Sequence, residues 1–244
     1  MSALSYLKTP ISFAGWFAVS LFFTIICIPL TLIPAPQRHR NRLYFCITTL
    51  WGKCLMFFSF IFVKKHGLEN LPEHPDSPSI FVVNHTSCLD IFIMESIMKG
   101  YPHIWLFKDA YAKVPLFSIL IKRMHIPVKR DSTVAAGKAL LKSYKLAKSL
   151  TSHVIMFPEG TRHHDGKVHE FNSGFALLAK KLNRPVIPIA ISGFNKIMPK
   201  KSIFIDYHAT QPTMTIGKPL TIGKSESVED FAQRTHNWFK QLLN

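Results

Sequence analysis

The stretch Ser79–Asp90 has the sequence SIFVVNHTSCLD, and it decides the fold expected for the rest of the chain. Its first half, SIFVVN, follows a Pro-rich loop and is rich in β-favouring residues, which predicts a short buried strand. The strand ends directly at His85, and the apolar pattern of Leu89–Met98 predicts a helix soon afterwards. Ligands bind at the carboxyl ends of strands in α/β sheets. A strand that ends at a histidine therefore marks a candidate functional site.

Strands and helices alternate along the rest of residues 64–244, which predicts an α/β domain. Helices are expected over Ser132–Leu150, with Ser132 as the N-cap, and over Phe175–Leu182, with Asn183 as a left-handed residue at its end. The other expected elements are strands at Ile104–Phe107, Ile126–Val128, His153–Phe157, Val186–Ser192, Ser202–Asp206 and Thr213–Ile216, a helix or apolar loop at Leu116–Met124, and a closing helix at Val228–Leu243.

The histidine at the end of the first strand is a candidate general base, because the ordinary pKa of histidine lies near working pH. His85 would need a carboxylate to fix its tautomer and to stabilise the imidazolium, and Asp90 could bend back from the next helix to do so. A second interpretation stays open. Ser87-x-x-Asp90 matches a capping box with Asp in the Glu position, so that Asp90 would complete a helix cap and His85 would be structural.

A second strand end leads into Phe157–Arg162, with the sequence FPEGTR, and predicts a tight turn. Gly160 permits unusual backbone dihedrals or the close approach of a ligand. Arg162 carries a planar fork of N–H groups that suits phosphate. Glu159 could hydrogen-bond a hydroxyl group or pair with a basic neighbour. Taken alone, such a turn is more often structural than functional.

The composition combines a high positive charge with an apolar character. The 244 residues carry 30 Lys and Arg against 14 Asp and Glu, a formal net charge of +16, and a mean hydropathy of +0.15. This excludes a disordered chain, and four cysteines without framework spacing exclude a disulfide scaffold. The charge suits an anionic membrane surface or a nucleic acid. Because no recognised nucleic-acid motif appears, we expect membrane lipid, and not nucleic acid, as the partner.

The apolar character is concentrated near the N-terminus. Ile11–Ile33 contains no charge in 23 residues, and about 20 apolar residues suffice to cross a bilayer as a helix. Pro29 is expected to break or kink this helix near its end. A second apolar stretch, Leu43–Val63, carries Lys53 in its middle. The alternative is a buried helix pair in a soluble core.

The chain is therefore divided at residue 64. Residues 1–63 are expected to form a membrane-anchoring helical segment, and residues 64–244 the domain that carries 25 of the 30 basic and all 14 acidic residues. A cationic cluster follows the first apolar stretch and places the domain on the cytoplasmic side of the membrane: Arg38, Arg40 and Arg42. A positive stripe at helical spacing would suit anionic lipid or form a solvated face: Lys138, Lys142 and Lys145.

Taken together, Asn84-His85-(four residues)-Asp90 and the later Phe157–Arg162 resemble the motifs of the glycerolipid acyltransferase family, and among them the 1-acyl-glycerol-3-phosphate acyltransferases. The resemblance covers roughly residues 64–220. It implies an α/β fold with a mixed sheet flanked by helices, preceded by an N-terminal membrane-associated helix pair. Further matching segments are Val114–Phe117, Pro127–Arg130, Phe171–Gly174 and Val186–Ile189.

The resemblance also implies roles for individual residues. His85 would take the proton from the acceptor hydroxyl, and Asp90 would orient His85. Substrate-binding roles would fall to residues of the second turn and to cations near strand ends: Lys108, Arg130, Glu159, Gly160, Thr161 and Arg162. The co-substrate would be acyl-CoA or acyl-carrier protein, and neither a metal nor another cofactor is expected.

The resulting hypothesis is a membrane-bound O-acyltransferase that acylates the sn-2 hydroxyl of lysophosphatidic acid to give phosphatidic acid. Family members usually carry Gly near Ser118 and Ile119, and often Asp at Lys129, so acylation of a different lyso-lipid stays open. A hydrolase that uses Ser87 or Cys88 is a further alternative, but the chain lacks a Gly-x-Ser-x-Gly elbow. The last alternative is a non-catalytic basic membrane adaptor or nucleic-acid binder.

Overall fold

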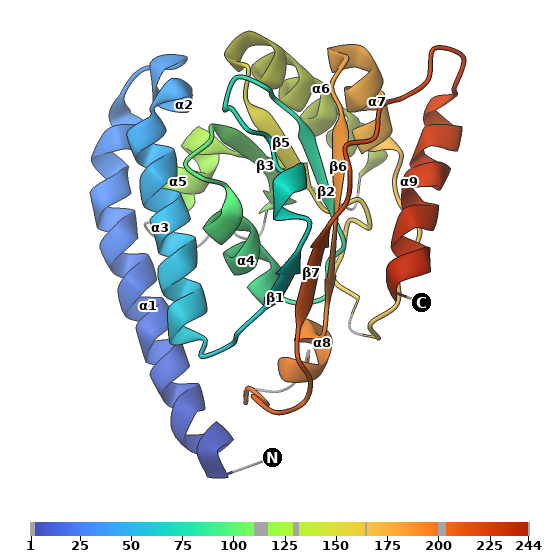
Figure 1. Ribbon diagram of the computed structural model, residues 1–244. Helices are drawn as coiled ribbons and strands as arrows, with labels where there is room; N and C mark the ends of the chain where they lie inside the picture. Colours follow the sequence, from blue (N-terminus) through green and yellow to red (C-terminus); the bar gives the residue numbers. More distant parts are fainter. Residues whose placement is uncertain (1–2, 110–116, 129–131, 164, 200–203, 244) are drawn as a thin grey trace.

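The computed structural model describes residues 3–109, 117–128, 132–163, 165–199 and 204–243, and within these ranges seven strands form one mixed sheet (Figure 1). The strand order is β1-β7-β6-β2-β5-β3-β4, and neighbours run parallel except for the antiparallel pair β6 and β7. The strands are β1 (Lys64–His66), β2 (Ile80–Val83), β3 (His103–Lys108), β4 (Ile126–Val128), β5 (His153–Met156), β6 (Val186–Ser192) and β7 (Thr213–Ile216). The expected α/β fold with a mixed sheet is confirmed.

Strand β2 lies inside the sheet because all four of its residues are apolar and buried, as is typical of a parallel strand with both faces covered. Successive side chains point to opposite faces. Ile80 and Val82 join one hydrophobic cluster, whereas Phe81 and Val83 join the other. In the register of the sheet, Val82 lies opposite Met156 of β5. The carboxyl ends of β2 and β5 therefore meet at one edge, and so do the two turns that follow them.

Helices cover both faces of the sheet (Figure 1). One cluster joins the sheet to α1, α3 and α4, and the other joins it to α6, α7 and α9. Ser132 caps α6 and Asn183 ends α7 in the left-handed region, as expected. The helices are α1 (Ala3–Leu32), α2 (Gln37–Arg40), α3 (Arg42–Phe58), α4 (Leu89–Ile97), α5 (Phe117–Met124), α6 (Thr133–Leu150), α7 (Gly174–Leu182), α8 (Phe194–Ile197) and α9 (Val228–Leu243).

Helix α1 runs for 30 residues through Pro29, so the helix is not broken at this proline, and the alternative of a kink stays a prediction. A proline inside a helix removes one backbone hydrogen bond and costs roughly 3 kcal/mol. The packing of α1 against α3 and α5 outweighs this cost. Within the described residues, α1 is the one helix that is long and apolar enough to cross a membrane, by length and composition alone. A third of its most apolar window is buried inside the protein.

The inner sides of α1 and α3 belong to the core of the molecule. Helix α3 lies close against α4 at Gly52, where an added Cβ would stand 2.6 Å from the Cβ of Glu95 and 2.7 Å from the backbone nitrogen of Ser96. Helix α1 is joined to α3 by a buried hydrogen bond of 3.1 Å, which the Trp16 indole N–H donates to the Leu55 carbonyl. The hairpin of α1 and α3 is thus fixed to the same helix that carries Asp90.

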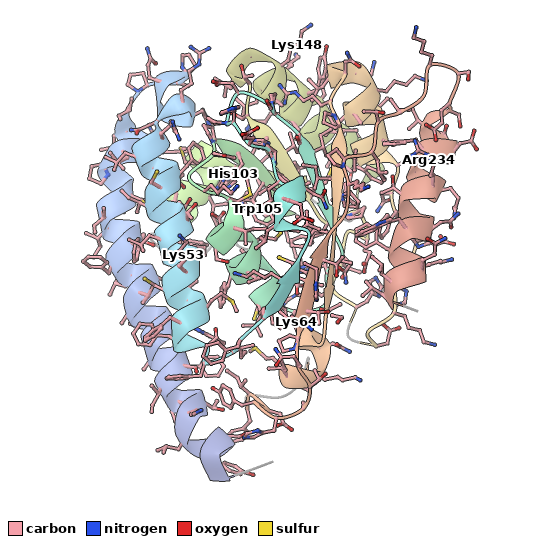
Figure 2. The ribbon with its side chains drawn as sticks, in the orientation of Figure 1. Lys53, Lys64, His103, Trp105, Lys148 and Arg234 are labelled. Atoms are coloured by element: carbon pink, nitrogen blue, oxygen red, sulfur yellow. The ribbon has the colours of Figure 1, made fainter. Side chains whose placement is uncertain are left out.

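The outer sides of the same two helices are apolar and exposed, interrupted by Lys53 on α3 (Figure 2). We call this surface the apolar outer face, and its large side chains are Tyr6, Leu7, Ile11, Phe13, Phe17, Leu21, Phe22, Ile25, Ile26, Leu32, Leu43, Leu50 and Phe57. Contiguous exposed apolar surface of this kind marks an interaction site on a protein or a membrane. The inner side of the hairpin thus fits the alternative of a buried helix pair, and lipid contact at the outer side stays a prediction.

Two short segments differ from expectation. Lys64–His66 forms strand β1 although it is polar and exposed, because a charged strand is suited to the edge of a sheet, where it pairs only with β7. Within the expected strand Ser202–Asp206, the described part, Phe204–Asp206, is not in a strand. Its Ile205 backbone N–H donates to the Thr9 hydroxyl of α1 at 3.1 Å. This apolar run is therefore buried against α1 instead of joining the sheet.

The close approach of α3 to α4 predicts opposite effects for one substitution at two glycines. We expect Gly52→Ala to lower stability, because the added methyl overlaps α4 and overpacking typically costs about 1–3 kcal/mol. We expect Gly137→Ala on α6 to raise stability by up to about 1 kcal/mol, because nothing lies within 4 Å of the new Cβ and alanine favours a helix. The melting temperature of each variant in detergent measures the effect. Shifts of the same sign in the two variants would contradict the close packing of α3 against α4 at Gly52.

Candidate active site

The turn after β2 is held to the neighbouring strand by an asparagine. The side-chain amide of Asn84 donates to the Ile191 carbonyl at 2.9 Å, and its carbonyl oxygen accepts from the Ile191 N–H at 2.7 Å. An amide side chain can replace a peptide group in this way, because it carries one donor and one acceptor side by side. The pair of bonds extends the sheet beyond Val83 and fixes the point at which His85 leaves it.

The imidazole of His85 lies against the carboxylate of Asp90, with 2.9 Å between Nδ1 and Oδ2. Both side chains are buried: His85 is 6% exposed and Asp90 is 0% exposed. A carboxylate at Nδ1 holds the proton on that nitrogen and leaves Nε2 as the basic one. The geometry is that of a general base with its orienting carboxylate.

The same carboxylate oxygen also caps the following helix. Oδ2 of Asp90 accepts from the backbone N–H groups of Thr86 at 2.7 Å and Ser87 at 2.8 Å. The bond to Ser87 is half of the expected capping box, whereas the Ser87 hydroxyl accepts from the Leu89 N–H at 3.4 Å. The pairing of His85 with Asp90 therefore forms together with one half of the capping box, because one oxygen accepts both bonds.

The face of the His85 ring is covered by Phe157, the first residue after β5. The two rings are stacked, with centroids 3.9 Å apart and an angle of 12° between their planes. Sequence reasoning placed Phe157 in the second motif but gave it no role. The adjacent ends of β2 and β5 explain the contact, since they bring the two turns together.

The second turn is closed by backbone bonds that depend on Gly160. Its N–H donates to the Phe157 carbonyl at 3.1 Å, and its φ of 71° lies in the left-handed region that favours glycine. Asn172 holds the turn from the other side, because its backbone N–H and its side-chain amide each donate to the Pro158 carbonyl at 2.9 Å. The turn therefore presents Glu159 to the interior and leaves Thr161 exposed.

Both backbone groups of His85 are held by this second turn. The His85 N–H donates to Oε1 of Glu159 at 3.4 Å, and the His85 carbonyl accepts from the His163 N–H at 2.9 Å. Sequence reasoning expected Glu159 to bind a hydroxyl or a basic neighbour. The structure adds a backbone partner that no sequence signal indicated, and it places the His163 Nε2 at 3.9 Å from Oε2.

Glu159 is kept largely protonated at neutral pH. Burial raises the pKa of its carboxyl to about 8; the His85 N–H opposes this rise, and the charges of Asp90 and Asp165 add to it. A neutral Glu159 can donate a hydrogen bond through Oε2, which has no hydrogen-bond partner among the described residues. It also places no negative charge on this turn.

The expected cations are distributed unevenly around this centre. Arg162 is half-buried, and its guanidinium lies near Cys88, where it opposes the burial that raises the pKa of the thiol. Lys108 is exposed at the carboxyl end of β3, beyond β5 in the sheet. Arg130 and Lys129 lie outside the described residues. The structure thus brings together His85, Asp90, Glu159, Gly160 and Arg162, with Thr161 exposed on the same turn, whereas Lys108 lies at the end of the next strand.

The alternative nucleophiles are directed elsewhere. The Ser87 hydroxyl faces the first turn of α4, and the Cys88 thiol contacts the sulfur of Met198 at 3.6 Å. The pKa of Cys88 is raised, which disfavours the reactive thiolate. Within the part of the chain that the structure describes, no group of three or more His, Cys, Asp and Glu could hold a metal ion.

Comparison with known proteins gives a consistent set of similarities. The family model Acyltransferase matches residues 62–192. The chloroplastic 1-acyl-sn-glycerol-3-phosphate acyltransferase BAT2 of Brassica napus is 33% identical over 198 residues, which cover 81% of this chain and 56% of that protein. The chloroplastic enzyme LPAT1 of Arabidopsis thaliana is 32% identical over 83% of this chain and 55% of its own length. The chain thus spans a little over half the length of these plant relatives.

A solved structure extends the similarity to the fold of nearly the whole chain. The crystal structure of the 1-acyl-sn-glycerophosphate (LPA) acyltransferase PlsC from Thermotoga maritima superposes with a TM-score of 0.75. The superposition covers 98% of this chain and 95% of that one, at 21% sequence identity. The N-terminal helices, which the family model does not reach, are therefore part of the shared architecture.

The raised pKa of Glu159 predicts a stability that falls as pH rises. Its folded-state value of about 8 exceeds the ordinary 4.5, so the folded chain binds this proton more tightly than the unfolded chain. The contribution is complete below pH 4.5 and is lost as pH approaches 8. We therefore expect the melting temperature of the wild type, relative to Glu159→Gln, to decline between pH 5 and pH 8.5.

Thermal scans of both proteins in detergent across this range measure the difference. The exposed Glu229 on α9 provides the control, because Glu229→Gln removes the same chemical group from a solvent-exposed position. A constant difference between the wild type and Glu159→Gln would show that Glu159 is already ionised at pH 5.

Proposed function

Because the chain belongs to the acyltransferase family, we propose that it transfers a fatty acyl chain to the sn-2 hydroxyl of 1-acyl-glycerol-3-phosphate, giving phosphatidic acid. The donor is a thioester, either acyl-CoA or acyl-carrier protein. The observation that carries the proposal is the buried pair of His85 and Asp90, 2.9 Å apart and enclosed by the Phe157–Arg162 turn. The names of the relatives support the choice of acceptor.

The reaction proceeds by direct transfer. Nε2 of His85 takes the proton of the acceptor hydroxyl while the oxygen attacks the thioester carbonyl carbon. The imidazolium is stabilised by Asp90, and it returns the proton to the thiolate as the carbon–sulfur bond breaks. General base catalysis of this kind contributes about 10²–10⁴-fold in rate. No acyl-enzyme forms, and the chemistry requires no metal and no cofactor beyond the acyl donor.

The acceptor phosphate is bound by cations. Arg162 supplies a planar fork, and Lys108 adds charge from the end of β3. The resemblance to the family assigns Arg130 to the same phosphate. The protonated carboxyl of Glu159 lets this turn approach a phosphate without repulsion and leaves Oε2 able to donate a hydrogen bond. Gly160 and Thr161 form the part of the turn that borders the acceptor.

The apolar outer face of α1 and α3 supports a membrane as the site of action of the enzyme. A lysolipid substrate is held in a bilayer, and exposed apolar side chains on two adjacent helices give the protein an affinity for the same phase. The basic residues that follow α1 favour the cytoplasmic leaflet, as does the positive stripe on α6. The catalytic domain therefore lies on the cytoplasmic face.

A different lyso-lipid acceptor is the second candidate function. The observation that favours it is the departure from the family pattern at Ser118, Ile119 and Lys129, in the segment thought to bind the acceptor. Acyl transfer by His85 would be unchanged in that case. A panel of lysophospholipids tested with acyl-CoA and with acyl-carrier protein separates the two candidates.

Loss of the base should abolish transfer. We expect His85→Ala and Asp90→Asn each to reduce kcat by about 10²-fold or more in an assay with radiolabelled lysophosphatidate and acyl-CoA or acyl-carrier protein. His74→Ala, which changes an exposed loop histidine, should keep the wild-type rate. Equal rates for the wild type and His85→Ala would refute the mechanism.

Loss of the phosphate fork should weaken binding of the acceptor. We expect Arg162→Ala to raise KM for lysophosphatidate about 10- to 100-fold, since hydrogen bonds to a charged group contribute about 1.5–3 kcal/mol. Arg162→Lys should restore only part of the affinity, because an ammonium group lacks the planar fork. Lys240→Ala on α9 is the charge-matched control, and an unchanged KM in Arg162→Ala would remove Arg162 from the acceptor site.

A further inference from the structure

A buried carboxylate outside the catalytic pair lies on the same helix as Asp90. Glu95 of α4 is 3% exposed, and its Oε1 accepts from the Trp105 indole N–H at 2.6 Å and faces Nε2 of His103 at 3.0 Å. Nδ1 of His103 donates to the Tyr101 carbonyl at 2.8 Å. Figure 2 shows His103 and Trp105 together in the interior of the molecule. No step of the proposed reaction uses this cluster.

The cluster is a buried ion pair. Burial by itself would raise the pKa of Glu95, but the charge and the hydrogen bond of His103 outweigh it and lower that pKa. The pKa of His103 is raised in turn, because Glu95 outweighs the effect of burial. His125, which stacks beside His103 at 6.1 Å, is kept neutral by burial, which lowers its pKa to about 3. The pair of Glu95 and His103 therefore lies beside the Trp105 indole, from whose N–H Glu95 accepts a hydrogen bond.

Two aromatic rings connect this cluster to the catalytic histidine. The rings of Trp105 and Phe157 lie 5.6 Å apart, and Phe157 is stacked on His85 at 3.9 Å. Trp105 is 6% exposed, and its residue lies opposite Ile155 in the pairing of β3 with β5. A continuous contact path therefore runs from Glu95 through two rings to the imidazole.

The contact path fixes the plane of the His85 ring, which the hydrogen bond to Asp90 does not fix. A single hydrogen bond fixes Nδ1 of His85 but leaves the ring able to tilt about that point. The stacked ring of Phe157 fixes the plane, and the two constraints together set the direction of Nε2. Phe157 itself needs support, which the neighbouring ring of Trp105 provides. The bond from Trp105 to Glu95 prevents rotation of the indole.

Burying a charged group at this position costs free energy of folding. A buried ion pair is seldom better for stability than apolar residues of the same volume. Oε2 of Glu95 has no hydrogen-bond partner within the described residues, which adds to the cost. Unlike an apolar side chain, the Glu95 carboxylate accepts a hydrogen bond from the Trp105 indole N–H and so fixes the orientation of the indole.

We propose that Glu95 is a positioning residue for acyl transfer, which fixes Trp105 and thereby the stack of Phe157 on His85. The proposal rests on the proposed function, in which His85 is the base. It places the orientation of the base under the control of a carboxylate that touches neither substrate.

The test compares two tryptophans that each donate a buried hydrogen bond. We expect Trp105→Phe to lower kcat about 10-fold or more, with KM for both substrates unchanged, because misplacement of a reacting group costs rate. Trp16→Phe removes the same kind of bond, to Leu55 and Ser59, and should lower the melting temperature while keeping kcat. Rates are measured per folded protein, well below the melting temperature of each variant.

Two further comparisons separate positioning from simple support of the fold. Glu95→Gln keeps an oxygen acceptor for the indole and should retain kcat within about 2-fold, whereas Glu95→Leu should match Trp105→Phe. If Trp105 acts through Phe157, the double variant Trp105→Phe/Phe157→Leu should be no slower than Phe157→Leu alone. The proposal would be overturned if the double variant lost kcat by the product of the two single losses. An unchanged kcat in Trp105→Phe would overturn it as well.

A measurement without turnover keeps this test apart from the proposed function. A stacked phenyl ring shifts the NMR signals of the His85 ring protons upfield, and His85→Ala assigns those signals. We expect the shift to shrink in Trp105→Phe and to persist in Trp16→Phe and Glu95→Gln. An active His85→Ala enzyme would refute the proposed mechanism alone, whereas an unaltered His85 signal in Trp105→Phe would refute the positioning role alone.

Discussion

One carboxylate oxygen organises the centre of this molecule. Oδ2 of Asp90 contacts the His85 ring and accepts from the backbone N–H groups of Thr86 and Ser87. Three contacts on one buried oxygen fix the turn, the start of α4 and the tautomer of the histidine together. Two further side chains stabilise the same turn. Asn84 fixes its beginning to strand β6, and Glu159 accepts from the backbone N–H of His85. The site is therefore preorganised by the same bonds that begin a helix.

Much of this could be predicted from sequence because the information is local. The run in Ser79–Asp90 contains a strand, a histidine and a carboxylate within one turn of helix, so the pairing of His85 with Asp90 needs no distant contact. The tight turn at Gly160 follows equally from its own residues. The parallel pairing of β2 and β5 was the one tertiary relation required, and alternating strands and helices already imply parallel neighbours.

The parts that could not be predicted depend on contacts across strands. Nothing local indicates that Phe157 covers His85, that Glu159 reaches a backbone N–H, or that Glu95 is buried among aromatic rings. A glutamate in an amphipathic pattern is ordinarily assigned to the solvent side, and contacts from other elements, among them α3 at Gly52, cover this one. The continuation of α1 through Pro29 has a related cause, because the packing of the helix outweighs the local tendency of proline to end it.

The contact between α3 and α4 also has a consequence for where the reaction takes place. The hairpin with the apolar outer face packs directly against the helix that carries Asp90. In the proposed membrane-bound enzyme, the height of His85 above the lipid surface is therefore set by the protein core and not by the bilayer. The proposed lyso-lipid acceptor would have to move a fixed distance out of the bilayer to reach His85. Each methylene of its acyl chain that leaves the hydrocarbon costs about 0.8 kcal/mol unless the protein covers it. Looser lipid packing would thus speed the enzyme by easing extraction of its substrate, without any change in its shape.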